Sequence, residues 1–556
     1  MKKIKYIVSL VLAASLFSAC LTSCEKEKKT ETGFDIFDIS AYDIVFSSSA
    51  DASVKASANA LKNRIEKGTS ASLDVRDDRE STDKEILVGY TDRVESKALR
   101  DKLDVVKNEK AFAIEVNGNK ICIMGKNADV TVRAVKYFAV NYIVNGKVDI
   151  PENLSIAQAA NTSTVIIPEN LVELKISEKK RVYAPSDKLS TDSLYYPTAA
   201  VLQYQENPAD NGKIIATLNS SEYFYRILES TDGGDSWSEK ALVSDKTNAN
   251  CRGGRMPMLY ELPADMGSYK KGTIVLAGTS SALNSSSEEK SAIVIYYSTD
   301  CGETWTGGQS IDFGAGRTDG DGIWEPCLIF DESTGRLYCF YSDDRDAAHD
   351  QKIVYKYTVD GVTWVGSNGN TVESAPFDAV ASSEASLRPG MVSITKMSNG
   401  EYIMVYEVGH SKYGDSTATV HYKKSTDLAD WSDISDVGPM VMSTDNRAFG
   451  SAPWCAYSEM GGENGLFITT GRYRDDRNSD PSEPDLFISF DYGKTFVTID
   501  NPFDYKNTDL NLGKFGYSPY FVVANDGKTI YYFNTSFFKP ANKTQCIEMV
   551  EIEIMP

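Results

Sequence analysis

A short polar pattern recurs five times in the second half of the chain and constrains its fold more than any other feature. Each copy has Ser or Thr two positions before an Asp, and an aromatic residue four or five positions after it. The copies lie 60 to 68 positions apart, and their central residues are Asp232, Asp300, Asp360, Asp427 and Asp491. A period of this length predicts a repeat architecture with one structural unit per copy.

The residues of the pattern predict a tight turn between two strands. Asp bonds to nearby backbone N–H groups, and the Gly present in most copies accepts a positive φ. Runs rich in β-branched and aromatic residues precede the copies, as in Ile293–Tyr297, and such runs are typical of strands. Each copy resembles the Asp-box of sialidase-like β-propellers. The resemblance places it as a hairpin turn between the two outer strands of a blade, far from the active site.

The period also predicts the number of blades. About 65 residues per repeat, over the roughly 385 residues of 172–556, correspond to six blades. Five blades carry the pattern, and a sixth, around 517–555, lacks it. A closed ring of blades leaves few exposed strand edges. The predicted fold is therefore mainly β, a six-bladed β-propeller preceded by a small α/β domain.

The α/β domain is expected over residues 35–165. Its predicted strands and helices alternate, and a sharp turn at 117–119 joins two of the strands. The predicted strands are 42–45, 85–89, 113–116 and 120–125, and the predicted helices are 52–65 and 127–142. The order resembles the accessory domain that precedes the catalytic barrel in several exo-acting glycoside hydrolases. It contains no catalytic constellation.

The first 34 residues are predicted to be a targeting segment and a tether. Lys2, Lys3 and Lys5 precede a short apolar run, which is typical of a signal peptide. Residues 21–24 end in Cys24 and resemble a bacterial lipobox, so residues 1–24 would be a lipoprotein signal with lipidation at Cys24. The charged segment 25–34 would be a disordered tether. These features predict a protein anchored by lipid to the cell envelope, at the outer membrane.

Composition excludes several other functions. The formal net charge is −21, whereas nucleic-acid binding requires a basic surface. The chain has three His and no CxxC motif, so no metal site and no cofactor are expected. A neutral oligosaccharide or polysaccharide is compatible with the charge, and a monomer is expected. The cysteines allow one disulfide, and Cys327 with Cys339, on neighbouring predicted strands, is the favoured pair.

Glu325 is the first catalytic candidate. It lies beside Trp324 in an otherwise apolar strand, where burial of a carboxylate is costly without a partner or a function. An apolar surrounding raises the pKa of a carboxyl group, which suits a general acid. The alternative is a structural ion pair with Arg317 or Arg345.

Glu407 is the second candidate. It ends the apolar strand 401–409, one blade after Glu325, and Arg388 lies upstream. Two carboxylates across a funnel are the minimum set for glycoside hydrolysis, and a separation of about 5–5.5 Å implies retention of configuration. The alternative is a structural ion pair between Glu407 and Arg388.

The order of several motifs between Tyr195 and Phe533 resembles glycoside hydrolase family 93, the exo-α-1,5-L-arabinanases. The motifs are 324–326 (WEP), 341–345 (YSDDR), 349–352 (HDQK), 388–391 (RPGM) and 406–407 (YE). The resemblance implies retaining hydrolysis of α-1,5-L-arabinan with release of arabinobiose. It implies Glu325 as acid/base and Glu407 as nucleophile, although the motifs alone allow the reverse. It also implies that a late tyrosine, Tyr517, lines the site.

Other side chains are weaker site candidates, each with a structural alternative. Trp324 and Trp454 would stack on sugar or belong to the core. The remaining candidates for substrate binding, which would line the funnel or brace a loop, are Asp344, Arg345, His349 and Arg388.

Two other functions remain open. An exo-sialidase shares the propeller but uses a Tyr nucleophile and three Arg residues. The place of the first Arg is occupied here by residues 194–197 (LYYP), so a triad would have to come from Arg388, Arg447 and Arg472. A non-catalytic surface propeller that binds glycans is the second alternative.

Overall fold

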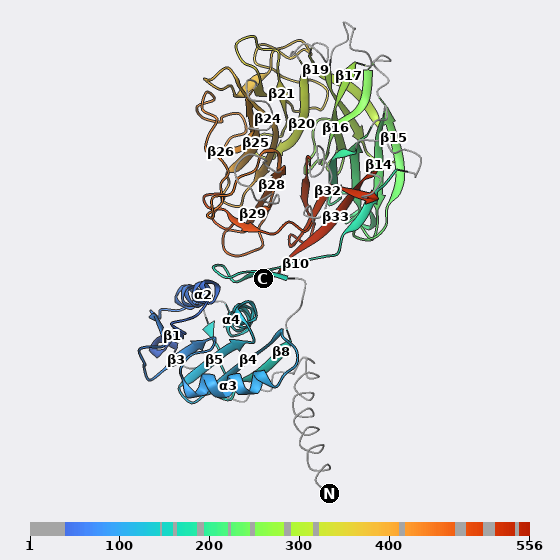
Figure 1. Cartoon of the computed structure of the whole chain (residues 1–556). Coiled ribbons are helices and arrows are strands. Elements are labelled where there is room, and N and C mark those ends of the chain that lie inside the picture. Colours follow the sequence, from blue (N-terminus) through green and yellow to red (C-terminus); the bar gives the residue numbers. More distant parts are fainter. Residues whose placement is uncertain are drawn as a thin grey trace. The chain divides into compact units, whose positions relative to one another are not determined.

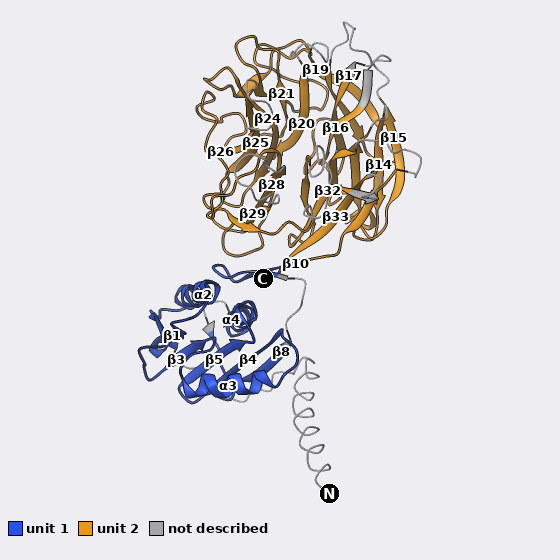
Figure 2. Cartoon of the chain, in the orientation of Figure 1, with its two compact units in different colours: residues 1–175, 555–556 blue, residues 176–554 orange. Residues whose placement is uncertain are grey.

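The computed structural model of the chain describes twelve ranges of residues. These are 39–144, 147–159, 164–185, 194–220, 224–244, 251–282, 291–314, 322–410, 418–472, 485–503, 517–539 and 544–555. The predicted lipobox with Cys24 and the tether lie outside them. No helix in the described ranges is long and apolar enough to span a bilayer. The chain forms two compact units, residues 1–175 with 555–556 and residues 176–554 (Figure 2).

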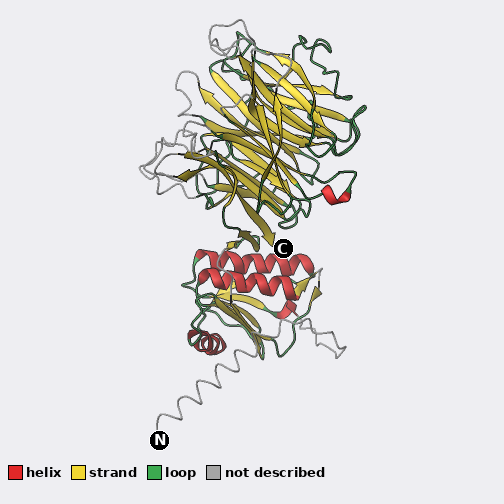
Figure 3. Ribbon diagram, turned by 90° about the vertical axis from the view of Figure 1, so that its right-hand side faces the viewer, coloured by secondary structure: helices red, strands yellow, loops and turns green. Residues whose placement is uncertain are grey.

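Unit 1 is a sheet with helices on both faces. Figures 1 and 3 show α2 (Ala52–Gly68) and α4 (Ala128–Tyr142) side by side on one face and α3 (Val94–Asp104) on the other. The strand order is β2-β1-β3-β5-β4-β8, with β4 and β8 antiparallel to their neighbours. The remaining elements of the unit are η1 (Ile39–Ala41), β1 (Asp43–Phe46), β2 (Val75–Asp77), β3 (Glu85–Val88), β4 (Ala111–Asn117), β5 (Lys120–Gly125), β6 (Ile143–Val144), β7 (Lys147–Val148), β8 (Ser155–Ala159), β9 (Thr164–Ile167) and β10 (Val172–Ile176).

The predicted helices of unit 1 form where the hydrophobic period places them. In α4 the Asn127 side chain accepts a hydrogen bond from the Val130 N–H at 3.0 Å, which caps the helix. The face of α4 in the buried cluster of the sheet contains Val130, Ala134, Val135, Phe138 and Ala139, whereas Val132 is buried outside that cluster. Helix α3 and strand β8 were not predicted. The hydrophobic residues of α3 are few, since only Leu99 and Leu103 are buried apolar positions along it.

Unit 2 confirms the six-bladed β-propeller. Five blades follow one another along the chain, each as an antiparallel sheet of three or four strands. Blade 1 is β12 (Tyr195–Val201), β13 (Ile214–Asn219), β14 (Phe224–Ser230) and β15 (Ser238–Ser244), with η2 (Pro208–Asp210) before β13. Blade 2 is β16 (Cys251–Glu261), β17 (Ile274–Ala282), β18 (Ala292–Ser298) and β19 (Thr306–Phe313). Blade 3 is β20 (Ile323–Asp331), β21 (Arg336–Asp343), β22 (Lys352–Thr358) and β23 (Phe377–Val380). Blade 4 is β24 (Leu387–Lys396), β25 (Tyr402–His410) and β26 (Thr419–Ser425), and blade 5 is β27 (Ser451–Ser458), β28 (Leu466–Arg472), β29 (Leu486–Ser489) and β30 (Val497–Ile499).

The sixth blade closes the ring with a strand from the other end of the unit. It contains β31 (Tyr520–Val523), β32 (Thr529–Lys539) and β33 (Thr544–Met555). Strand β11 (Lys180–Tyr183), from the start of the unit, pairs with β33. A blade built from both ends of the unit joins blade 6 to blade 1 and removes an open edge.

The five repeated turns lie where the pattern predicts them, directly after the third strand of blades 1 to 5. In the second turn the Ser298 hydroxyl donates to Asp300 Oδ1 and accepts the Gly302 N–H, both at 2.8 Å. Asp300 Oδ1 also accepts the Thr304 N–H at 2.9 Å. The Trp305 indole folds back and donates to the Gly302 carbonyl. The side chains of the pattern thus satisfy the backbone of the turn.

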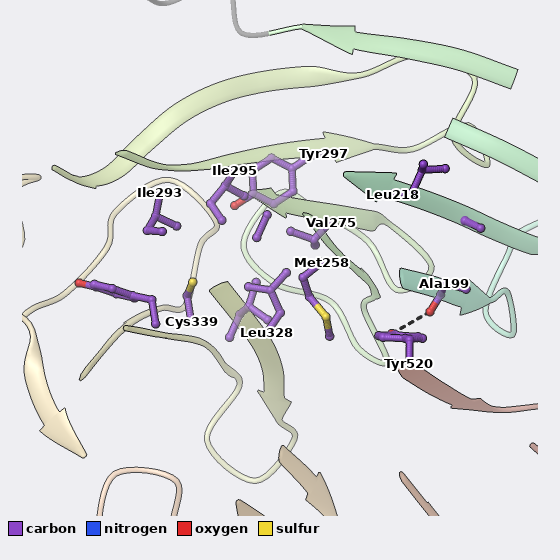
Figure 4. Packing of buried hydrophobic residues seen from close by; sticks show 14 of the residues in the cluster. Ala199, Leu218, Met258, Val275, Ile293, Ile295, Tyr297, Leu328, Cys339 and Tyr520 are labelled. Carbon is purple, nitrogen blue, oxygen red and sulfur yellow. Dashed lines mark hydrogen bonds between the residues drawn. The ribbon is translucent and has the colours of Figure 1, made fainter. Parts of the chain in front are cut away.

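The predicted disulfide between Cys327 and Cys339 is wrong, because both thiols are free. The two residues lie on the paired strands β20 and β21, but Cys327 is opposite Phe340 and Cys339 is opposite Leu328. A one-residue offset puts side chains on opposite faces of a sheet. Figure 4 shows Cys339 in the same cluster as Leu328, whereas Cys327 belongs to the buried cluster on the other face.

Candidate active site

Six residues with left-handed backbone surround the centre of the propeller, one at the inner strand of each blade. We call them the funnel ring: Tyr196, Met256, Glu325, Met391, Ala452 and Ser518, with φ between 47° and 63°. All except Met391 precede a proline. In the first five blades the strand register shifts at this point. Such bulges re-aim side chains next to active sites, and a proline at a bulge costs no ladder hydrogen bond.

The second strand of the preceding blade holds most of the ring in place. The N–H of Met256 bonds to Asn219, that of Glu325 to Thr279, that of Met391 to Ser342 and that of Ala452 to Glu407. We call Asn219, Thr279, Ser342 and Glu407 the ring supports. The distances range from 2.8 to 3.2 Å. Each polar side chain satisfies a backbone donor that the bulge has removed from the strand ladder.

The ring lines a pocket with contributions from all six blades. The space within it is about 390 Å³, part of which is open to solvent. Its wall is mostly proline, methionine and aromatic side chains, and Glu325 is the one carboxylate among its lining residues. The lining contains no Lys or Arg in the described part of the chain.

Glu325 lies on the pocket wall with a hydroxyl group at each carboxylate oxygen. The Tyr196 hydroxyl donates to Oε1 at 2.7 Å, and the Ser342 hydroxyl donates to Oε2 at 3.0 Å. Loss of hydration raises the pKa of the Glu325 carboxyl, and the negative charge of Asp344 adds to this effect. The two hydroxyl groups oppose the shift by stabilising the ionised form. The described partners of Glu325 are therefore hydroxyl groups. Of the two arginines considered from the sequence, Arg345 is bonded to Asp312 and Asp343 instead, and Arg317 lies outside the described residues.

Glu407 occupies a ring-support position on β25. Its Oε2 accepts the Ala452 N–H at 2.8 Å, and in the strand register it lies opposite Gly390. The Arg388 guanidinium bonds to Gln351, to Asp344 and to the Asp350 carbonyl. The predicted alternative, a structural ion pair of Glu407 with Arg388, is therefore not formed. Both glutamates are bonded into the funnel ring, but of the two only Glu325 is among the described residues that line the pocket.

Trp324, Asp344 and Arg388 form a polar network beside Glu325. The Trp324 indole donates to Asp344 Oδ2 at 3.3 Å, and Arg388 lies 3.2 Å from the same oxygen. Burial raises the pKa of Asp344 despite the opposing effect of Arg388. The indole lies over Gly322, where any larger side chain would collide with it. Trp324 thus points to Asp344 and is not among the residues that line the pocket.

Arg345 and His349 brace loops of blade 3. The Arg345 guanidinium is bonded to Asp312 and to Asp343, at 2.8 and 2.6 Å. Nδ1 of His349 lies 3.3 Å from Asp346, which also pairs with Lys352 at 2.9 Å. Of the two roles considered for these side chains, the contacts favour bracing over sugar binding.

Trp454 and Tyr517 both lie near the ring. The Trp454 ring is 4.5 Å from that of Tyr520, its indole donates to the Phe521 carbonyl, and it lines the pocket. The Tyr517 hydroxyl is 3.4 Å from that of Tyr196 and 3.5 Å from Met391 Sδ. The structure therefore places the late tyrosine against the residue that bonds Glu325.

Sequence reasoning missed Tyr196, Ser342 and the ring itself. The sequence did contain a signal for the ring. Its six members lie 60 to 69 positions apart, and five of them are followed by proline, Met391 being the exception. This second period runs in phase with the Asp repeat. It marks one inner-strand position per blade, and Glu325 is the one ring member with an ionisable acidic side chain.

Two of the three arginines considered for a sialidase triad, Arg388 and Arg447, do not line the pocket. Arg388 is held by Asp344 and Gln351. Arg447 is ion-paired with Asp485 and Asp445. The side chain of Arg472 is outside the described part of the structure. The contacts of Arg388 and Arg447 disfavour the recognition of a sugar carboxylate.

Comparison of the fold with solved structures finds similar propellers. The α-L-arabinanase of Penicillium chrysogenum, solved with arabinobiose, is 25% identical, covering 68% of this chain and 98% of that protein with a TM-score of 0.53. A family 93 glycoside hydrolase, the α-L-arabinofuranosidase of Fusarium graminearum solved with arabinobiose, is 22% identical with the same coverage and a TM-score of 0.54. No family model and no curated protein matches the sequence. With this fold and this similarity, the chain is a glycoside hydrolase.

Proposed function

We propose that the chain is a retaining, exo-acting hydrolase that releases arabinobiose from α-1,5-L-arabinan, with Glu325 as acid/base and Glu407 as nucleophile. The observation that carries this proposal is the position of Glu325. Among the described residues, it is the one carboxylate on the wall of a pocket made by all six blades. The similarity to propellers that were solved with arabinobiose supports the choice of substrate.

The two glutamates differ in a way that supports these roles. The raised pKa of Glu325 favours a carboxylic acid that keeps its proton until it is transferred to the leaving oxygen. Oε2 of Glu407 accepts a backbone N–H, which fixes one oxygen of the carboxyl group proposed as the nucleophile. In the first step, Glu325 would protonate the glycosidic oxygen while Glu407 bonds to the anomeric carbon. In the second, Glu325 would take a proton from water, which displaces Glu407.

Exo action is supported by the side chains that fill the centre of the ring. Tyr196, Met391 and Ala452 form a buried apolar cluster, against which Met256 and Tyr517 pack. The substrate therefore has to enter from the solvent-open side of the pocket, and the arabinobiose bound by the similar propellers supports a chain end as the part that enters. In the described residues the lining has no Lys or Arg and no charged group besides Glu325, which suits an uncharged sugar.

The test is hydrolysis of linear arabinan by the purified protein. We expect arabinobiose as the single early product, with little loss of viscosity, and retention of the anomeric configuration by NMR. Glu325→Gln and Glu407→Gln should each lose on the order of 10³-fold or more in kcat. Glu332→Gln, at an exposed position just after the strand of Glu325, is the matched control and should be unchanged. Full activity of either site variant would contradict the proposal.

Azide distinguishes the roles of the two glutamates. With Glu325→Ala, azide should attack the glycosyl-enzyme and give a glycosyl azide of retained configuration. With Glu407→Ala it should attack the substrate directly and give the inverted product. The opposite pattern would exchange the two roles. Release of sialic acid from sialyllactose would favour a sialidase, and glycan binding without any product would favour a binding propeller.

We also propose attachment to the outer membrane through lipid on Cys24, supported by the lipobox in the sequence. Metabolic labelling of the full chain with a fatty-acid analogue should mark the wild type. The Cys24→Ala variant should remain unlabelled. Labelling of that variant would contradict the proposal.

A further inference from the structure

Tyr196 reaches the pocket from a different blade than the carboxylate it contacts. It lies on β12 of blade 1, whereas Glu325 lies on β20 of blade 3, yet their side chains meet at 2.7 Å. The left-handed backbone at both residues turns their side chains toward the pocket. A hydrogen bond across the funnel therefore fixes one carboxylate oxygen of Glu325.

The second oxygen is fixed by a hydroxyl group whose direction is determined. Ser342 Oγ accepts the Met391 N–H at 3.2 Å, so its own proton is available to Glu325 Oε2 at 3.0 Å. The backbone N–H of Glu325 is held by Thr279. Backbone and both oxygens of Glu325 thus have separate partners, which restricts the plane of the carboxyl group.

Tyr196 is itself held firmly. Its ring meets that of Tyr517 edge-on, with 5.5 Å between centroids and an angle of 81°, and packs against Tyr195 at 5.4 Å. Burial, with the nearby Glu325 charge, raises the pKa of the Tyr196 hydroxyl well above its usual value. The hydroxyl therefore keeps its proton over the working range and always donates.

We infer that Tyr196 is a positioning residue, which holds the acid/base Glu325 in one orientation and sets the affinity of that carboxyl for its proton. This inference rests on the proposed function. When Glu325 has given its proton to the leaving oxygen, the hydrogen bond from Tyr196 becomes a charge-assisted one and strengthens. It thus favours the state that follows proton transfer. Ser342 acts in the same way on the other oxygen.

Tyr196→Phe tests this role, because it removes the hydroxyl and keeps the ring. We expect kcat/KM on arabinan to fall on the order of 10- to 100-fold, the usual effect of a hydrogen bond to a charged group. The high-pH limb of kcat/KM, which reports the free enzyme, should move to higher pH, because the ionised carboxyl loses a donor. Unchanged kcat/KM would overturn the inference.

A substrate with a better leaving group distinguishes a positioning role of Tyr196 from a general loss of structure in the variant. With a 4-nitrophenyl arabinobioside the leaving group needs little protonation, so Tyr196→Phe should lose less than about threefold in kcat/KM. An equal loss on both substrates would overturn the inference. Tyr297→Phe, which removes a buried hydroxyl bonded to the Gly361 carbonyl in the core of blade 2, is the control and should leave the pH limb unchanged.

A direct titration separates this inference from the proposed function. The infrared carboxyl signal that disappears in Glu325→Gln reports the protonation of Glu325 without any substrate. In Tyr196→Phe this signal should titrate at a higher pH than in wild type, and titration at the same pH would overturn the inference. A shift without hydrolysis of any arabinoside would support the contact and refute the proposed function. Ser342→Ala should shift the titration in the same direction and is the second variant if Tyr196→Phe does not fold.

Discussion

Glu325 affects stability as well as activity. Loss of hydration raises its pKa above the ordinary value, so the folded protein holds the proton more tightly than the unfolded chain. This stabilisation is fully present below the unfolded pKa and is lost as the pH rises through the folded pKa. Near neutral pH the ionised carboxyl therefore opposes folding. We predict that Glu325→Gln, which is uncharged at every pH, melts at a higher temperature than wild type at about pH 7.5.

The difference should shrink in acid, because Glu325 is protonated in both states at about pH 4. Thermal unfolding followed by circular dichroism at the two pH values measures it. Glu332→Gln, at its exposed position, should give no pH-dependent difference. A melting temperature for Glu325→Gln that is equal to or below that of wild type at about pH 7.5 would refute the explanation.

For individual residues, the sequence predicted the Glu325 carboxylate but not the side chains that bond to it. Glu325 is conspicuous because a single charge interrupts an apolar strand. Tyr196 and Ser342 are 129 and 17 positions away from it, and hydroxyl residues are common in strands. The contact of Tyr196 depends on ring closure and on a left-handed backbone. Neither can be deduced from the residues next to Tyr196.

The repeated turns differ in how much their first residue, Ser or Thr, contributes to the stability of the fold. Ser298 is buried and satisfies the Gly302 N–H, whereas Ser425 of the fourth turn is partly exposed and bonds to the Asp427 and Asp430 carbonyls. Removal of a partner from a buried donor costs about 1–3 kcal/mol. We predict that Ser298→Ala lowers the free energy of unfolding by that amount and Ser425→Ala by less than about 1 kcal/mol.

Urea denaturation of the two variants measures this difference in the free energy of unfolding. Hydrolysis assays measure whether either substitution changes activity. Both variants should keep the kcat/KM of wild type, because the turns lie after the third strands while the pocket is lined by the inner strands. Equal destabilisation by the two substitutions, or a selective loss of activity, would contradict this assignment of the turns to the scaffold.

Elements with a local cause were predictable from the sequence. The turns follow from Ser, Asp and Gly within a few residues, and helix α4 follows from its period and its Asn127 cap. The funnel ring was not recognised, although its prolines are periodic, because the backbone conformation it needs is rare for residues other than glycine. In the described part of blade 4, an isolated bridge between His421 and Met440 stands beside β26 in place of a fourth strand.

At the scale of the whole molecule, the count of six blades was predictable because the repeat period divides the length of the unit. The closing contacts were not, since they join residues about 370 positions apart. Lys180 bonds to Glu551 of β33 and to Asp235 of the first turn, each at 2.5 Å. One side chain thus connects the strand that completes blade 6 with a turn of blade 1.

This connection should be energetically coupled, because Lys180 and Glu551 can only meet when the ring is closed. We predict a coupling energy of about 0.5–2 kcal/mol from a double-mutant cycle of Lys180→Met and Glu551→Gln. The pair Lys270–Asp265 has a similar distance, 2.7 Å, but is local and exposed. Its cycle, with Lys270→Met and Asp265→Asn, should give less than about 0.5 kcal/mol. Urea unfolding provides all the values. Equal coupling in the two cycles would mean that Lys180 acts as an ordinary surface charge and that closure depends on the strand pairing alone.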